Sequence, residues 1–425
     1  MTHLTTLSVR ALGTVSALAL TAASALAVDL TLMTNSNDNQ AAVLADFIER
    51  YKEVAPDVNI ELNLVGYDVI RDQLQTQLQA GEGPDIALVT NLGGLNPFYV
   101  ELSPYVDTAE WEAAYGSVLP WYRAGKPDGI YGFHTEMTVT GPFVNVTMFD
   151  EAGVEIPPAG ATWDDWAVAT QAVMDATGSY AGMVMDRSGH RMAGPAMSYG
   201  AKYFDEDGNW VIDDGFKEFA RRMIDWHASG LMPPDIWPAV SGSKYATGNE
   251  LFFGEEVPFY MSGSWNTGNV NTNVGDTFEW AVVPVPCGPA GCGVMPGGAG
   301  LVAFNHGENA EEAAKFVAWM GELENAREWY TRTSSIPAHA TLQAEGLDYA
   351  SAGAPEAVSE GLNLFAEMVA AATEQTPQAF RAQGSPTNTA VFNATVQYLA
   401  EAMNGSITLD EAVVKMQEEI DKNAN

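Results

Sequence analysis

The sequence feature that most restricts the fold of this chain is a regular alternation of strands and helices in its N-terminal part. Three short segments have the residue pattern of strands, and the two segments between them carry apolar residues at helical spacing. In chain order, the five segments are 28–33, 42–51, 58–65, 67–79 and 85–90. Strands joined by helices of these lengths predict βαβ crossovers and a parallel sheet. We therefore expect an α/β fold.

The residues that follow each predicted strand are candidate ligand contacts, because open α/β sheets bind ligands beyond the carboxyl ends of their strands. Asn37 lies in the polar turn after the first strand, and Tyr67 follows Gly66 after the second. Asn91 comes directly after the third strand. Tyr67 has an equally good alternative interpretation, as a residue that only packs against the start of its own helix.

Beyond residue 130, two strand-rich runs at 131–146 and 278–285 lie on either side of a mostly helical stretch. About 400 residues follow the N-terminal segment, which is too many for one ordinary hydrophobic core. We therefore expect two lobes, with the chain leaving the first lobe at one run and returning at the other. From residue 311 onward the sequence is almost wholly helical.

The first 27 residues have the pattern of a secretory signal peptide. Arg10 precedes an apolar run at 11–23, and an Ala-x-Ala site follows at 25–27. The run is too short to span a membrane. The sequence thus predicts an exported protein that is cleaved before Val28. A hydrophobic content of 47% with 17% charged residues is typical of a globular chain.

The charge balance disfavours nucleic acid and anionic membranes as partners. The chain has 55 acidic and 19 basic residues, a formal net charge of −36, so it repels phosphates. Its two cysteines, Cys287 and Cys292, lie in a Gly- and Pro-rich loop. In an exported protein such a pair favours a disulfide. Metal binding would need two further ligands, for which His306 is the nearby candidate, so no metal is expected.

Segment 251–270 has the pattern of a ligand-facing strand and turn. A short apolar strand at 257–261 breaks into Ser262-Gly263-Ser264-Trp265, with more polar residues beyond. Ser264 offers a hydroxyl, and Trp265 offers an aromatic face of the kind that stacks on the C–H surfaces of carbohydrates. The alternative is that Trp265 is an ordinary core residue.

Further candidate contacts come from four other segments. Thr138 lies in the first strand-rich run, and His190, with Arg191 beside it, follows a strand-like 182–185. Gly298, in Gly297-Gly-Ala-Gly300, would let backbone amides approach a ligand closely, unless the segment is a plain turn. Arg381 lies in 378–386, which reads as irregular, and could hold a phosphate or a hydroxyl pair. A surface ion pair explains Arg381 equally well.

Signals of catalysis are absent from the sequence. The six histidines show no HExxH spacing, and neither a Gly-x-Ser-x-Gly elbow nor a phosphate-binding glycine loop occurs. A carboxylate pair for glycoside hydrolysis stays open among so many acids. We expect a receptor without catalysis or cofactor, with a secreted carbohydrate-active enzyme as the alternative.

Several separated stretches resemble one family, the extracellular solute-binding proteins of bacterial ABC importers, in the branch of the maltose- and glycerol-3-phosphate-binding proteins. Besides the segments at 251–270 and 297–300, the matching stretches are 81–86, 143–153, 157–158, 162–166, 313–319, 324–329 and 335–338. They follow the family's order along nearly the whole chain after the signal peptide.

The resemblance implies a two-lobed periplasmic binding protein of type II, in which each lobe is a mostly parallel sheet flanked by helices and a hinge joins the lobes. It implies residues 28–138 and 281–323 in lobe 1, and 139–280 and 324–425 in lobe 2. Such a protein closes on its ligand and delivers it to the transmembrane subunits of an ABC permease. We expect a periplasmic monomer.

The resemblance also implies a carbohydrate-type ligand: a sugar, an oligosaccharide, a polyol or glycerol 3-phosphate. Tyr67, Ser264, Gly298 and Arg381 fall where the glycerol-3-phosphate binders place ligand contacts, with the arginine as the implied phosphate partner. Asn91 and Ser335 depart from that pattern, since those proteins have an acid and a tyrosine at these places. Trp265 is more similar to the sugar binders. A polyamine or peptide receptor would need acids at the aromatic turn, where there are none.

Overall fold

The computed structural model describes residues 1, 27–36, 38–126, 128–239, 242, 244–371 and 376–423. Most of the predicted signal peptide and the predicted contact Asn37 therefore lie outside the described residues. Among the described helices, none is long and apolar enough to cross a membrane.

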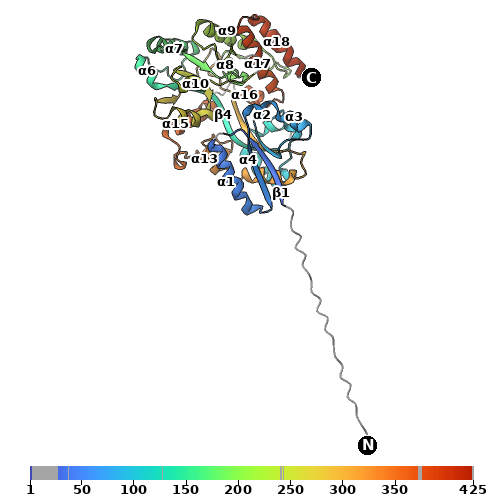
Figure 1. Ribbon diagram of the computed structural model, residues 1–425. Helices are drawn as coiled ribbons and strands as arrows, with labels where there is room; N and C mark the ends of the chain where they lie inside the picture. Colours follow the sequence, from blue (N-terminus) through green and yellow to red (C-terminus); the bar gives the residue numbers. More distant parts are fainter. Residues whose placement is uncertain are drawn as a thin grey trace.

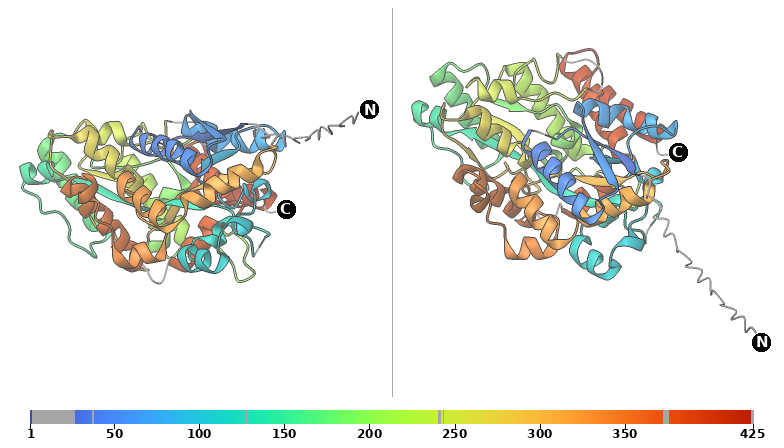
Figure 2. Two further views of the ribbon diagram at one scale, coloured as in Figure 1. Left: turned by 90° about the horizontal axis from the view of Figure 1, so that it is seen from below. Right: turned by 60° about the horizontal axis from the view of Figure 1, so that its bottom comes forward.

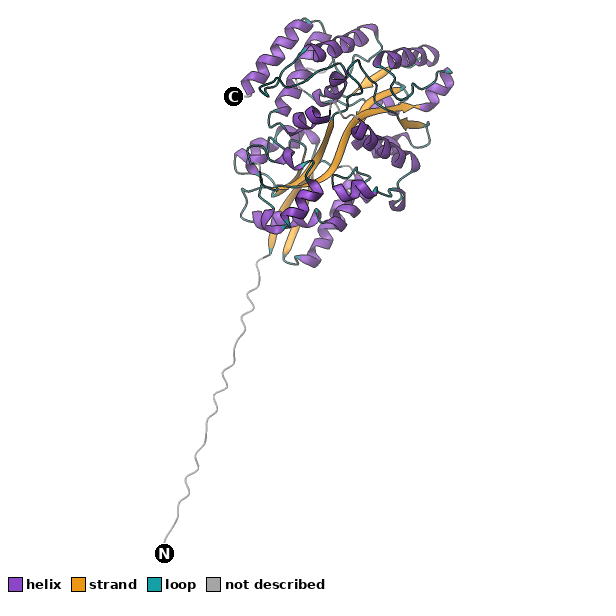
Figure 3. Cartoon of the chain, turned by 180° about the vertical axis from the view of Figure 1, so that it is seen from behind, coloured by secondary structure: helices purple, strands orange, loops and turns teal. Residues whose placement is uncertain are grey.

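The strands form one sheet that runs along the molecule, with helices on both sides (Figure 3). Its order is β2-β1-β3-β8-β4-β6-β5, and β7 also pairs with β4. The strands are β1 (Val28–Thr34), β2 (Val58–Leu64), β3 (Ile86–Val89), β4 (Phe133–Asn145), β5 (Met183–Met185), β6 (Phe259–Gly263), β7 (Trp280–Val282) and β8 (Pro296–Ala303).

The predicted α/β fold is confirmed, but the sheet is mixed rather than mostly parallel. The pairings β1·β2, β1·β3 and β5·β6 are parallel, as the βαβ alternation predicts. The pairings β3·β8, β4·β8, β4·β6 and β4·β7 are antiparallel. All four antiparallel pairings involve β4 or β8: β4 comes from the run at 131–146, which passes between the two parts of the molecule, and β8 follows the second run at 278–285.

Strand β4 joins the two parts of the sheet. Residues 133–139 of β4 pair with β8, whereas residues 140–144 pair with β6 and 143–145 with β7. Every residue of β4 except Glu136 is buried. Layers of helices cover both faces of the sheet (Figure 2). Side chains on both faces of β4 are therefore buried along nearly its whole length.

The helices occupy most of the remaining chain. The α-helices are α1 (Asp38–Val54), α2 (Tyr67–Asp72), α3 (Leu74–Gln79), α4 (Thr108–Tyr115), α5 (Leu119–Tyr122), α6 (Val146–Ala152), α7 (Trp163–Thr177), α8 (Gly189–Ser198), α9 (Asp214–Ser229), α10 (Asn249–Phe253), α11 (Thr267–Val274), α12 (Ala310–Met320), α13 (Leu323–Thr333), α14 (Ala340–Glu345), α15 (Glu356–Ala371), α16 (Thr376–Gly384), α17 (Asn388–Met403) and α18 (Leu409–Asn423). Short 3₁₀ turns are η1 (Asn96–Phe98), η2 (Ser103–Tyr105), η3 (Ser264–Asn266) and η4 (Ala350–Ala352).

Helices from distant parts of the sequence pack together at the two ends of the molecule (Figure 1). At one end α13 lies against α1, where Arg50 pairs with Glu328 at 2.8 Å and Arg332 pairs with Asp46 at 2.6 Å. At the other end α8, α9, α17 and α18 contact one another. Helix α13 thus packs with the N-terminal part of the fold although it follows residue 323.

The predicted disulfide between Cys287 and Cys292 is present. It closes a small loop in which the amide of Gly288 donates to the carbonyl of Gly291 at 2.9 Å. The amide of Cys287 donates to the carbonyl of Ala161, and the amide of Trp163 donates to the carbonyl of Cys287. These contacts attach the loop to the start of α7.

Candidate ligand-binding cleft

A cavity of about 530 Å³ lies where the carboxyl ends of β1, β2 and β3 face β5, β6 and α8. Asn35 and Ser36 follow β1, and Thr90 and Asn91 follow β3, as the rule for open α/β sheets predicts. Polar side chains dominate the lining. The amides among them are Asn35, Gln40, Asn91, Asn249, Asn266, Asn269, Gln383, Asn388 and Asn393, and the charged residues are Arg71, Glu136, Arg187 and Arg191.

Six of the residues predicted from the sequence lie around this cavity. They are Tyr67, Asn91, Thr138, His190, Trp265 and Gly298. Tyr67 begins α2, and its hydroxyl is 3.1 Å from that of Thr90. The ring of Tyr67 meets the ring of Tyr245 edge to face, with centroids 5.9 Å apart. This contact joins the helix that follows β2 to a loop that packs on β5 and β6.

Two predicted contacts do not line the cavity. Ser264 is buried, and its hydroxyl oxygen accepts a hydrogen bond from the amide of Val139 at 3.0 Å. Arg381 is exposed and donates to the carbonyl of Gly208 at 2.9 Å, with its guanidinium 4.1 Å from the ring centroid of Phe204.

The sequence was interpreted wrongly around Arg381, because residues 376–384 form helix α16 instead of an irregular stretch. A helix turns by about 100° per residue, so positions 381 and 383 point in nearly opposite directions. Gln383 therefore faces the cavity, and Arg381 faces away from it.

The floor of the cavity is one face of the sheet. Directly opposed residues of antiparallel strands share a face, and the opposed pairs here are Glu136 with Ala299 and Thr138 with Gly297. These four residues all line the cavity. Gly298 lies within β8, so Gly297 and Gly298 belong to a strand and not to a turn. A Cβ at Gly298 would come within 2.2 Å of the carbonyl oxygen of Glu136, so this position requires glycine.

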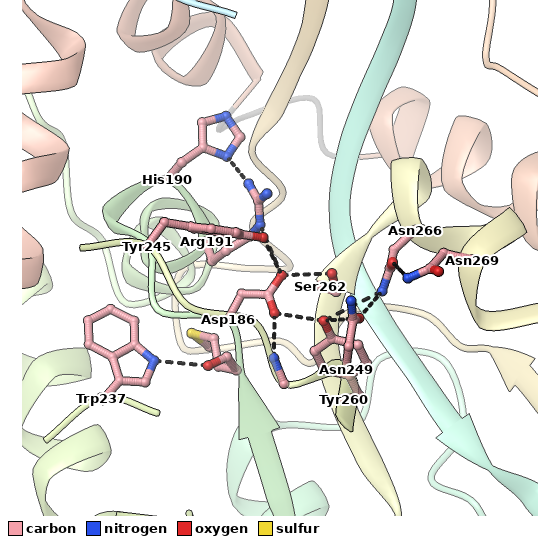
Figure 4. Close-up of polar contacts among 12 residues, drawn as sticks. Asp186, His190, Arg191, Trp237, Tyr245, Asn249, Tyr260, Ser262, Asn266 and Asn269 are labelled. Carbon is pink, nitrogen blue, oxygen red and sulfur yellow. Dashed lines mark hydrogen bonds and ion pairs between the residues drawn. The ribbon is translucent and has the colours of Figure 1, made fainter. Parts of the chain in front are cut away.

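A fully buried carboxylate, Asp186, organises the opposite wall (Figure 4). It follows β5 directly and accepts hydrogen bonds at 2.7–3.3 Å from four groups: the hydroxyls of Tyr245, Tyr260 and Ser262 and the amide of Gly248. Burial of the hydroxyls beside this acid raises the pKa values of Tyr245 and Tyr260 above the usual range for tyrosine. Both phenols therefore stay protonated and act as donors to the carboxylate.

Arg191 connects Asp186 to the predicted aromatic residue Trp265. Its Nε lies 3.7 Å from the carboxylate of Asp186, and its guanidinium carbon is 3.7 Å from the ring centroid of Trp265. One face of the indole is thus covered by a cation. The remaining surface of the ring lines the cavity.

His190 stays neutral in this arrangement. Its Nε2 is 3.2 Å from the carbonyl oxygen of Pro296, to which it donates, so Nδ1 accepts from Arg191 at 2.9 Å. Burial, assisted by the charge of Arg191, lowers the pKa of His190 to about 3. The histidine therefore positions Arg191 and carries no charge near neutral pH.

A second buried arginine, Arg187, holds the loop that carries Tyr245. Its guanidinium donates to the carbonyls of Lys244 at 2.9 Å and Gly242 at 2.7 Å. Burial lowers its pKa to about 10, so the group remains charged near neutral pH. Its Nη1 and Nη2 atoms face protein carbonyls, which places this charge in the wall of the cavity, whereas its buried Nε has no hydrogen-bond partner.

Asparagine side chains continue the polar wall away from Asp186 (Figure 4). The amide of Asn266 donates to the oxygen of Asn249 at 2.9 Å, and the amide of Asn269 donates to the oxygen of Asn266 at 2.9 Å. The hydroxyl of Tyr260 lies 2.8 Å from the same oxygen of Asn249. Amides offer both donors and acceptors without net charge, which suits an uncharged, hydroxyl-rich ligand.

Sequence reasoning missed several of these residues. A signal existed for Asp186 and Arg187, because both come directly after a strand-like segment, where a ligand site is expected. Tyr245 and Asn249 follow no predicted strand, so nothing local marks them. No group of three or more metal-ligating side chains occurs among the described residues.

Comparisons with known proteins agree with the geometry. Residues 34–327 match the family model described as bacterial extracellular solute-binding protein. Two curated relatives are arabinooligosaccharide-binding proteins. The one from Bacillus subtilis is 28% identical over 178 residues, 40% of each chain. The one from Halalkalibacterium halodurans is 25% identical over 304 residues, 67% of this chain and 65% of the relative. The matches thus span less than two thirds of the length of these relatives.

Solved structures share the fold at low sequence identity. The GacH receptor of Streptomyces glaucescens, solved unliganded and with acarbose, has a TM-score of 0.74 and 18% identity, covering 94% of this chain and 99% of its own. A maltose/maltodextrin-binding domain from Bdellovibrio bacteriovorus bound to maltotriose has a TM-score of 0.73 and 12% identity, covering 93% and 100%. The family's members and these neighbours are solute-binding proteins, not enzymes. The chain belongs to the family of bacterial extracellular solute-binding proteins and has their two-lobed fold.

Proposed function

We propose that this protein is the substrate-binding component of an ABC importer and that its ligand is an uncharged oligosaccharide. The observation that carries the proposal is the lining of the cavity, in which amides outnumber charged residues and Trp265 exposes part of an aromatic ring. Amides replace the water around sugar hydroxyls, and an indole covers the apolar side of a sugar ring. The names of the two curated relatives favour the same class of ligand.

The size of the cavity supports a short oligosaccharide. Its volume of about 530 Å³ lies within the range of about 300–1,000 Å³ that is usual for sites that enclose a small ligand. Trp265 and Tyr67 both line the cavity and supply aromatic surfaces for ring stacking. We propose that these two residues, with Asn91, Thr138, His190 and Gly298, surround the ligand.

A phosphorylated ligand such as glycerol 3-phosphate is not part of the proposal. Arg381, the expected phosphate partner, lies outside the cavity. The guanidinium of Arg71 already donates two hydrogen bonds to Asp72, and Arg187 donates to carbonyls. Arg191 pairs with Asp186. A phosphate would therefore compete with existing interactions of all three guanidinium groups and would find only the Nε atoms of Arg187 and Arg191 without a hydrogen-bond partner.

We propose that ligand binding closes the two lobes and that the closed form docks on the transmembrane subunits of a permease. Lobe 1 comprises residues 28–138 and 281–323, and lobe 2 comprises 139–280 and 324–425, with one change. Helix α13 is better assigned to lobe 1, because its ion pairs join it to α1. We further propose that residues 1–27 are a cleaved signal peptide and that the mature protein is a periplasmic monomer.

Titration calorimetry and thermal shift on residues 28–425 test the proposal. The ligands are arabinotriose, maltotriose, their monosaccharides and glycerol 3-phosphate. We expect one trisaccharide to bind at micromolar or lower concentration and to raise the melting temperature, since a ligand that binds only the folded state stabilises it. Chromatography of the same mixtures after a day checks for turnover. Binding of glycerol 3-phosphate alone, or release of monosaccharides, would contradict the proposal.

A further inference from the structure

Glu136 occupies a special position on the floor of the cavity. It follows an irregularity in the register of β4 and lies opposite Ala299 of β8. Glu136 is the one residue of β4 that is only partly buried, and it shares the cavity-facing side of the sheet with Thr138. The strand therefore presents a carboxyl group to the space that a ligand would fill.

This carboxyl group has no partner in the part of the chain that the structure describes. Glu136 is the one acidic residue in the cavity lining there, and its side chain makes no hydrogen bond or ion pair. The arginines of the lining are already engaged. Arg71 donates to Asp72 at 2.7 and 2.8 Å, Arg191 faces Asp186, and Arg187 donates to backbone carbonyls.

The surroundings of Glu136 disfavour its charged form. Burial raises the pKa of this carboxyl from its usual value of 4.5 to about 7. The ionisable groups on the neighbouring strand and helix and around the cavity are His134, Tyr330, Tyr67, Arg71, Arg187, His190, Arg191 and Tyr245. Burial lowers the pKa of His134 to about 3 and raises that of Tyr330, so both stay neutral near pH 7.

A carboxylate that is shielded from water and has no hydrogen-bond donor lowers the stability of the folded protein, unless a ligand supplies the missing donors. The lining holds one further acceptor without a partner among the described residues, the buried side-chain oxygen of Asn35. The Nε groups of Arg187 and Arg191 are donors without a hydrogen-bond partner there. Hydroxyl groups both donate and accept hydrogen bonds, so a hydroxyl-rich ligand matches both kinds of group.

We propose that Glu136 is a ligand-contacting residue whose carboxylate accepts hydrogen bonds from two neighbouring hydroxyl groups of the bound carbohydrate. This inference rests on the function proposed above and adds an acidic contact to a lining whose other charged residues are arginines. Hydroxyl donors stabilise the ionised carboxylate, so its pKa falls when the ligand binds. Binding below about pH 7 then releases a proton, so affinity rises as the pH increases toward about 7 and levels off above it.

Calorimetry in two buffers of different ionisation enthalpy measures this proton directly. Arabinotriose and maltotriose are titrated into the wild-type protein, Glu136→Gln and Glu61→Gln at pH 6, 7 and 8. Glu61 is an exposed glutamate in β2 and serves as the matched control. Glutamine keeps one acceptor oxygen and the size of the side chain, but it has no charge and does not titrate.

The proposal expects wild type and Glu61→Gln to release close to one proton per ligand at pH 6, about half a proton at pH 7 and little at pH 8. Glu136→Gln should release none and bind about tenfold to hundredfold more weakly at pH 8, as expected for the loss of hydrogen bonds to a charged group. Binding by wild type without proton release overturns the inference and leaves the proposed function intact, whether or not the variant folds. If wild type binds no sugar at any pH, both proposals fall.

Discussion

Replacing Asp186 by asparagine tests whether the buried carboxylate organises the binding wall. The change removes one charge and preserves the size of the side chain. The carboxylate accepts hydrogen bonds from four residues, Tyr245, Gly248, Tyr260 and Ser262. Arg191 lies 3.7 Å away and has a side-chain exposure of 13%, so it would lose its counter-charge. Asparagine can accept with one oxygen only, and its amide group would face hydroxyl donors.

The contacts of Asp186 set the size of the expected effect. A hydrogen bond to a charged group contributes about 1.5–3 kcal/mol, and breaking a buried ion pair by removing one partner costs about 3–5 kcal/mol. The hydroxyl of Ser262 can turn and accept from the new amide, which recovers part of the loss. We therefore expect Asp186→Asn to lower the free energy of unfolding by about 3–5 kcal/mol. Ligand affinity should also fall, because Tyr245 and Arg191 lose the group that positions them.

Urea unfolding followed by tryptophan fluorescence measures this loss, and calorimetry measures the change in affinity. Asp225→Asn is the matched control, since Asp225 is exposed on α9 and makes no hydrogen bond or ion pair in the described part of the chain. The control should unfold as wild type does. Equal unfolding free energies for the two variants would show that the network around Asp186 contributes little, and the reasoning from its contacts would be wrong.

The remaining predictions concern the cavity lining. Trp265→Ala should weaken ligand binding in calorimetry by roughly 1–3 kcal/mol through lost stacking, whereas Arg381→Ala, outside the cavity, should leave affinity unchanged. Gly298→Ala should lower the melting temperature, because its Cβ would lie 2.2 Å from a carbonyl oxygen of β4, whereas Gly268→Ala, with nothing within 4 Å, should not. Burial lowers the folded-state pKa of His190 from its usual value of 6.5 to about 3, so its contribution to stability is present above pH 6.5 and lost as pH falls toward 3. His190→Asn should therefore unfold in urea with a weaker pH dependence in that range.

The sequence predicts best the elements whose pattern is local. The segments expected as strands at 28–33, 58–65 and 85–90 are observed as β1, β2 and β3 with ends that differ by a residue or so. Their carboxyl ends also point to the cavity, because the topology of a βαβ series fixes that edge. The prediction of a mostly parallel sheet failed for β4 and β8, since the pairing of strands from distant segments leaves no local pattern.

Arg381 and Ser264 show why single side chains are harder to predict. Both lie within a few residues of true lining residues, Gln383 and Trp265. In a helix, a shift of two positions turns a side chain away from the cavity. At the turn after β6, the hydroxyl of Ser264 bonds to the amide of Val139. Sequence reasoning identified the correct segments, but the direction of each side chain depends on backbone geometry.

The network around Asp186 explains why the most informative residues of the site were the least predictable. Asp186 joins the end of β5 and the first turn of α8 to the loop that holds Tyr245 and to Ser262 of β6, which lie 59 and 76 residues further along the chain. In the sequence, each of these segments contains only a polar residue, which by itself does not indicate this network. Their combination fixes Arg191 over one face of Trp265 and leaves the rest of the ring toward the cavity. The aromatic contact inferred from the sequence therefore depends on a buried acid about 80 residues earlier in the chain, so Trp265→Ala and Asp186→Asn should have non-additive effects on ligand affinity.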